Sequence, residues 1–139
     1  MTDVPHAGHV LRYPYLWARQ AGQGETEGRK PRPCAVILAL SSGKGQTELR
    51  LCAITTQPPR RETHAVEVPE IEKRRAGLDG SVALWVIVDE HNLDVFEQSF
   101  YIEPQSMLGA FSSTFTKELQ TAMIVALRQR KSNAVRRRD

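Results

Sequence analysis

The main pattern in the sequence is a series of short apolar runs separated by polar stretches rich in glycine and proline. Short runs that contain many β-branched and aromatic residues are typical of strands. Five or six strands are predicted: VLRYPY (10–15), CAVILAL (34–40), ELRLCAIT (48–55), THAVEVP (63–69), SVALWVIVDE (81–90) and a weaker LDVFEQSFYIEP (93–104).

The pattern changes to a helical period after residue 112. Large apolar side chains then recur at every fourth position, namely Phe115, Leu119, Met123 and Leu127. Residues with this spacing share one face of a helix, so we expect a helix over 114–130 that packs on the sheet. A shorter helix of one or two turns is predicted within 69–80, where Pro69 suits the start and Gly77 suits the stop.

These elements predict a mainly β fold with a C-terminal helix, in which the strands form a small, strongly bent antiparallel sheet. Small SH3-like barrels are built this way, but the pattern alone does not select among all-β folds. The length of 139 residues fits one domain. We expect a flexible N-terminus over 1–8, a single domain over 9–131 and a basic disordered tail over 132–139. The polar, glycine-rich segment 18–30 is expected to be a loop.

The charge is unevenly distributed along the chain. The formal net charge is +3, but residues 128–139 hold six cations and one acid, so +3 minus +5 leaves −2 for residues 1–127. The high isoelectric point of the chain therefore results from the cations of residues 128–139. It does not by itself predict nucleic-acid binding by the rest of the protein.

The composition also bears on compartment and cofactors. No apolar run approaches the roughly 20 residues of a membrane helix, and the N-terminal segment lacks the layout of a signal peptide. The two cysteines, Cys34 and Cys52, have neither metal-binding spacing nor the arrangement of a disulfide framework. We therefore expect a reduced, cytoplasmic protein that needs no metal or other cofactor.

Within residues 1–127, a dense cluster of positive charge lies directly before an apolar strand. In RKPRPCAVILAL, the cations Arg29, Lys30 and Arg32 alternate with two prolines just ahead of the run 34–40. A guanidinium offers a planar, charged fork of several donors, which suits a phosphate group. Cations held at the start of a rigid strand are therefore candidates for binding an anion.

The order of these segments resembles the MazF/PemK toxin family, also called the Kid family, of bacterial toxin–antitoxin systems. The likeness runs over about residues 8–128 and consists of GHVLRYPY, a glycine-rich loop, RPCAVILAL, LCAITTQ, THAVEV, GLDGSVALWVIV and a late helix after LGAFS. The segment VDEHNLD departs from the family's Gln-Ile-Arg-Thr type of sequence. The resemblance implies an SH3-like barrel, a homodimer, metal-independent cleavage of single-stranded RNA, and a neutralising antitoxin with a partly disordered segment.

The resemblance also implies roles for individual residues. Arg32 would stabilise the phosphorane that forms when the RNA 2′-hydroxyl attacks the adjacent phosphate, and Thr55 would donate a second hydrogen bond. The expected substrate-binding residues are Thr56, Gln57, His64, Arg19, Gln23, Arg29, Arg60 and Arg61. Asp89 and Glu90 lie where relatives carry polar site residues, and Trp17 is the aromatic residue best placed to stack on a base.

Several alternatives remain at this stage. The proton acceptor is not assigned, because arginine is a poor base and His64 is also compatible with a plain surface position. Thr55 is equally a residue that simply ends a strand. A catalytically silent SH3-like binding module would need neither Arg32 nor Thr55. A related toxin that acts on a topoisomerase would instead use C-terminal residues, and the basic tail keeps this possibility open.

Overall fold

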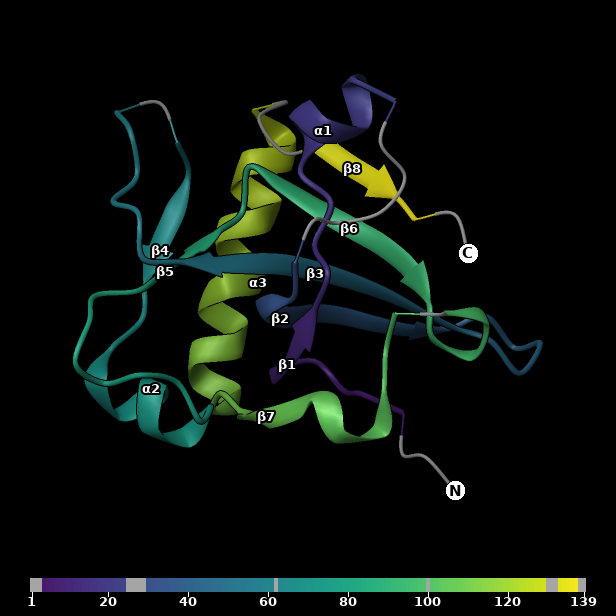
Figure 1. Ribbon diagram of the computed structural model, residues 1–139, viewed down its shortest axis with the longest axis horizontal. Helices are drawn as coiled ribbons and strands as arrows, with labels where there is room; N and C mark the ends of the chain where they lie inside the picture. The colour runs from purple at the N-terminus through teal and green to yellow at the C-terminus, as the bar shows by residue number, and fades with distance from the viewer. Residues whose placement is uncertain (1–3, 25–29, 62, 100, 130–132, 138–139) are drawn as a thin grey trace.

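The computed structural model describes residues 4–24, 30–61, 63–99, 101–129 and 133–137 (Figure 1). Its strands are β1 (His9–Tyr13), β2 (Arg32–Ser41), β3 (Thr47–Thr55), β4 (Ala65–Glu67), β5 (Trp85–Ile87), β6 (Glu90–Val95), β7 (Met107–Ala110) and β8 (Asn133–Arg136). Its α-helices are α1 (Ala18–Gly22), α2 (Glu70–Arg75) and α3 (Ser113–Arg128), and 3₁₀ turns lie at Phe96–Gln98 and Pro104–Ser106. Within the described ranges, no helix is long and apolar enough to cross a lipid bilayer.

The strands form one sheet that forks at β3. The main path runs β4-β5-β3-β2-β1-β7, while β6 also pairs with β3 and β8 pairs with β6. All ladders are antiparallel except the parallel pair β6–β8. One edge of β3 is divided between β6, beside Glu48–Leu51, and β5, beside Ile54 and Thr55. The two branches diverge, and the sheet is not closed into a barrel by any ladder among the described residues.

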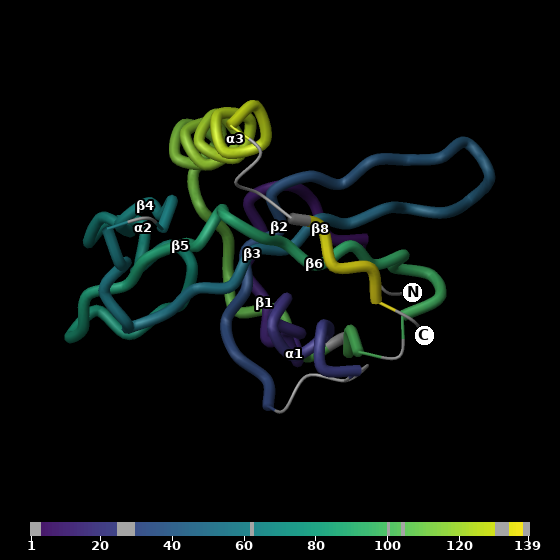
Figure 2. The backbone as a smooth tube through the Cα atoms, turned by 90° about the horizontal axis from the view of Figure 1, so that it is seen from above, coloured from purple at the N-terminus to yellow at the C-terminus, as the bar shows by residue number. Residues whose placement is uncertain are grey.

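The central strands are buried on both faces. Val10 and Ala35 pack in the cluster that includes Phe115 of α3, whereas their neighbours Leu11 and Cys34 belong to a second cluster on the opposite face. Figure 2 shows α3 on one side of the sheet and α1 on the other. A strand covered on both faces needs apolar residues at every position, which explains residues 34–37 at the start of the run CAVILAL, whereas Leu40 at its end is 51% exposed.

The predicted mainly β fold with a C-terminal helix is confirmed, but the predicted SH3-like barrel is not, because the sheet remains open between β4 and β7 among the described residues. The helix expected over 114–130 is α3, and the side chain of its N-cap Ser112 accepts a hydrogen bond from the Phe115 N–H at 3.1 Å. Phe115, Leu119 and Met123 are buried as expected, but Leu127, expected on the same face, is 44% exposed. The short helix expected within 69–80 is α2. It is followed by Gly77 at φ +68°, a left-handed conformation that favours glycine at a helix end.

Three sequence predictions are wrong in the described residues. The segment 18–30 was expected to be a loop, but α1 occupies its first five residues. The stretch LDVFEQSFYIEP is not one strand, because β6 ends at Val95 and a 3₁₀ turn follows. The tail 132–139 was expected to be disordered, but β8 pairs with β6. Strand β7 was not predicted at all.

Candidate functional site

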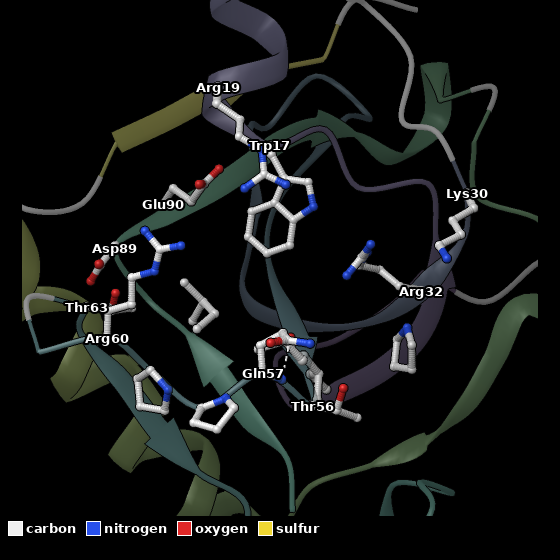
Figure 3. Close-up of a pocket in the computed structure, with 16 residues that line it drawn as sticks. Trp17, Arg19, Lys30, Arg32, Thr56, Gln57, Arg60, Thr63, Asp89 and Glu90 are labelled. Atoms are coloured by element: carbon white, nitrogen blue, oxygen red, sulfur yellow. Dashed lines mark hydrogen bonds between the residues drawn. The ribbon is translucent and has the colours of Figure 1, made fainter.

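A cavity of about 730 Å³ lies at the edge of the sheet where several strand ends meet (Figure 3). Its polar and aromatic lining consists of Trp17, Arg19, Lys30, Arg32, Thr55, Thr56, Gln57, Arg60, Thr63, Asp89 and Glu90. Four of these side chains are cationic and two are carboxylates. The cavity therefore combines positive charge, hydroxyl groups, acids and an aromatic ring.

Strand register explains why these residues meet. β2 and β3 are antiparallel with Cys34 opposite Ala53, so the first residue of β2, Arg32, and the last residue of β3, Thr55, lie at the same edge. β5 pairs with the end of β3 and leads directly into Asp89 and Glu90. Separate parts of the sequence therefore converge, because the start of β2 and the ends of β3 and β5 lie at the same edge of the sheet.

The Arg32 guanidinium is held over an aromatic ring. Its carbon lies 5.3 Å from the centroid of the Trp17 ring, and the Arg19 guanidinium carbon lies 5.7 Å from the same centroid. The Arg32 Nε is buried and has no hydrogen-bond partner within the described part of the chain. A buried donor without a protein acceptor can bond a ligand oxygen, so Arg32 is suited to bind an anion in the cavity.

The Thr55 hydroxyl is oriented by the loop that follows it. Its oxygen accepts a hydrogen bond of 3.0 Å from the backbone N–H of Gln57. Because a hydroxyl can accept and donate at the same time, the Thr55 proton remains able to bond an oxygen in the cavity. Thr56 and Gln57 are exposed and line the same wall.

Glu90 is a half-buried carboxylate in this cationic cavity. Its Oε2 accepts hydrogen bonds from the backbone N–H of Ala18 at 2.7 Å and from the Tyr15 hydroxyl at 3.3 Å. Burial raises the pKa of Glu90 above its ordinary value, although these two bonds and the nearby Arg19 charge act in the opposite direction. A positioned carboxylate with increased proton affinity can accept a proton near neutral pH.

Asp89 has a structural partner outside the cavity. Its Oδ1 accepts the backbone N–H of His64 and lies 3.3 Å from the His64 Nδ1. The other ring nitrogen of His64, Nε2, is 2.9 Å from Oε1 of Gln129, at the C-cap of α3. His64 therefore connects the loop before β4 to α3, and it does not line the cavity.

The structure brings together most of the sequence-predicted site residues. The ones that line the cavity are Arg19, Arg32, Thr55, Thr56, Gln57 and Arg60, together with Trp17, Asp89 and Glu90. His64, Gln23 and Arg61 are not among the described residues that line it, and Arg29 lies outside the described residues.

Lys30 belongs to the cationic segment 29–32 that was predicted to bind an anion, and it lines the cavity together with Arg32. Thr63 also lines the cavity but was missed as a site candidate. Its residue type and position in the sequence carry no signal, because only the path of the loop before β4 brings it to the cavity.

The chain matches no protein-family model, and no curated protein matches it significantly.

Proposed function

We propose that this protein is a metal-independent endoribonuclease of the MazF/PemK type, the toxin of a toxin–antitoxin pair, that cleaves single-stranded RNA. The observation that carries the proposal is the meeting of Arg32 and Thr55 in one cavity with Arg19, Lys30 and Arg60. Cations beside an aromatic side chain are the features by which proteins bind single-stranded nucleic acids. The ordered sequence resemblance supports the same assignment.

The proposed reaction uses the RNA 2′-hydroxyl as the nucleophile. Glu90 accepts the proton of that hydroxyl while its oxygen attacks the adjacent phosphorus. Arg32 binds the phosphorane oxygens, on which negative charge develops, and the Thr55 hydroxyl donates a further hydrogen bond. The bond from phosphorus to the 5′-oxygen then breaks, and the departing oxygen takes a proton from water, which leaves a 2′,3′-cyclic phosphate and a 5′-hydroxyl. Glu90 returns its proton to water and is ready for the next cycle.

The same proposal includes protein partners. An antitoxin with a partly disordered, acidic segment would compete for the cavity, since carboxylates and phosphates bond the same guanidinium groups. Cleavage that continues unchanged with such a partner bound would exclude this mode of inhibition. We also propose a cytoplasmic homodimer, supported by the exposed apolar side chains Ile124, Val125 and Leu127 on α3. Light scattering that gives only a monomer mass of 15.6 kDa would exclude the dimer.

The proposed function is tested by a time course on a long, mixed-sequence single-stranded RNA in the presence of a chelator. We expect the RNA to be cleaved at the same rate with and without the chelator, and the products to carry cyclic phosphate ends. DNA of the same sequence should not be cleaved, because it lacks the 2′-hydroxyl. Cleavage that stops with the chelator would refute the metal-independent mechanism. If the folded wild-type protein cuts no RNA, a silent binding module or a toxin acting on a topoisomerase becomes the better assignment.

A matched pair of substitutions at Thr55 tests its hydroxyl. Thr55→Val keeps the shape of the side chain but removes the donor. We expect cleavage to slow about tenfold, the effect of one hydrogen bond of about 1.5 kcal/mol to a charged group. Thr55→Ser keeps the hydroxyl and should retain most of the rate. Initial rates measured side by side decide the matter, and equal rates for the two variants would remove Thr55 from the mechanism.

A further inference from the structure

The C-terminal strand lies against the strand that carries Glu90. β8 runs parallel to β6, with Asn133 opposite Glu90 and Arg136 opposite Leu93. Figure 1 shows β8 between β6 and α1 at one end of the sheet. Val135 and Arg137 are buried, whereas Ala134 and Arg136 are exposed, so alternate residues of this segment point into the protein.

Arg137 connects this segment to the chain between β1 and α1. It is only 5% exposed, and its Nη1 donates to the backbone carbonyl of Pro14 at 2.8 Å and to Oδ1 of Asn92 at 3.2 Å. Its guanidinium carbon lies 4.1 Å from the centroid of the Tyr101 ring and 5.2 Å from that of Tyr13. Arg137 therefore contacts three segments that are distant in sequence.

Asn92 extends this connection to the cavity. Its Oδ1 accepts the backbone N–H of Leu16 at 2.8 Å, and its Nδ2 donates to the Leu16 carbonyl at 2.7 Å. The next two residues are Trp17, which lines the cavity beneath Arg32, and Ala18, whose N–H bonds Glu90. Hydrogen bonds through Asn92 thus link Arg137 to Leu16, and the backbone from Leu16 to Ala18 continues this link to the wall formed by Trp17 and Glu90.

We propose that β8 is a strap that positions the Trp17–Glu90 wall of the cavity, and that Arg137 is the positioning residue of this strap. The contacts of Arg137 fix Pro14 and Asn92, and these fix the backbone of Leu16 to Ala18. The strap contacts β6 and the segment before α1, but it lies outside the apolar cluster that packs beneath α3. Its effect on the structure is therefore expected to be local.

The strap is held by few interactions. β8 has four residues, and the Nε and Nη2 of Arg137 are buried without a hydrogen-bond partner in the described ranges. Short edge elements with incompletely satisfied polar groups open at lower free energy than the core. Release of β8 is therefore expected to loosen the Trp17–Glu90 wall while the sheet and α3 remain folded.

Amide hydrogen exchange on the full-length chain tests the proposal without any ligand. Arg137→Ala should raise the exchange rates of the Leu16 and Ala18 amides about tenfold, as expected for loss of hydrogen bonds from a charged group. The amide of Leu119 in α3 should be unaffected. Arg136→Ala is the matched control, since it removes an exposed neighbouring cation from the same segment and should change neither set of amides.

Any other result of the exchange experiment would contradict the proposal. Unchanged exchange at Leu16 and Ala18 in Arg137→Ala would show that Arg137 does not position the wall. An equal rise at Leu119 would show a global effect on folding, and an equal effect of Arg136→Ala would show a general effect of charge. If Arg137→Ala does not fold, Arg137→Lys is judged by the same criteria, with a smaller selective rise expected because an ammonium lacks the planar fork.

A second readout rests on the proposed function. In the cleavage assay, Arg137→Ala should raise KM and lower kcat together by several-fold, because Trp17 and Glu90 are both displaced, and Arg137→Lys should recover part of each. If the wild-type protein cuts no RNA, the proposed function fails, but the exchange experiment still decides whether β8 positions the wall.

Discussion

Arg32→Ala is expected to lower the rate of RNA cleavage about a hundredfold while the protein stays folded. The substitution removes a charged donor that can stabilise the phosphorane by on the order of 3 kcal/mol, which corresponds to about a hundredfold in rate. Arg32→Lys should recover little of this loss, because one ammonium does not reproduce the planar fork. Initial rates on a single-stranded RNA with chelator present measure the effect.

Arg61→Ala provides the matched control for the charge change. Arg61 is an exposed cation in the loop after β3, but it does not line the cavity among the described residues. Its removal should change the rate only slightly, through weaker long-range attraction of RNA. Equal rates for the wild type and Arg32→Ala would contradict the assignment of the site, and equal losses in Arg32→Ala and Arg61→Ala would reduce the role of Arg32 to general attraction.

The elements that could be predicted from the sequence are those whose burial is visible in their own residues. Residues 34–37 of the run CAVILAL are all apolar because both faces of this part of β2 are covered. The four-residue spacing of Phe115 and Leu119 marks the face of α3 that packs on the sheet. In both cases the local pattern and the tertiary environment agree.

The extent of β6 could not be predicted because its buried residues are polar. His91, Asn92 and Asp94 are all at most 2% exposed. Asp94 accepts the Tyr13 hydroxyl at 2.7 Å, and Asn92 bonds both backbone groups of Leu16, so distant partners satisfy these side chains. An alternation of apolar and polar residues does not reveal a strand of this kind.

The same reasoning applies to β8 and to the candidate site. The sequence SNAVRRRD has the composition of a solvated tail, and only the free edge of β6 makes its first part a strand. The convergence of Arg32 and Thr55 follows from the register of β2 and β3, and the ordered resemblance predicted it. The positions of His64 and Arg61 depend on the path of the loop between β3 and β4, which carries no periodic signal.

Glu90→Gln is expected to lower the cleavage rate about a thousandfold and to remove the acidic limb of the pH–rate profile. A general base contributes on the order of 10²- to 10⁴-fold, and glutamine is nearly the same size but does not accept the proton. The base acts only when deprotonated, so the wild-type rate should fall as the pH falls through the pKa of Glu90.

The position of that limb follows from the environment of Glu90. Burial raises its pKa, while the Ala18 N–H, the Tyr15 hydroxyl and Arg19 lower it and the neighbouring Asp89 charge raises it, with a net shift upward. The acidic limb should therefore lie at higher pH than for an exposed glutamate. Profiles of kcat/KM between about pH 4 and 9 measure it, since this ratio reports the pKa values of the free enzyme. Glu67→Gln, which changes an exposed glutamate on β4, is the matched control. An acidic limb that persists unchanged in Glu90→Gln would show that another group accepts the proton.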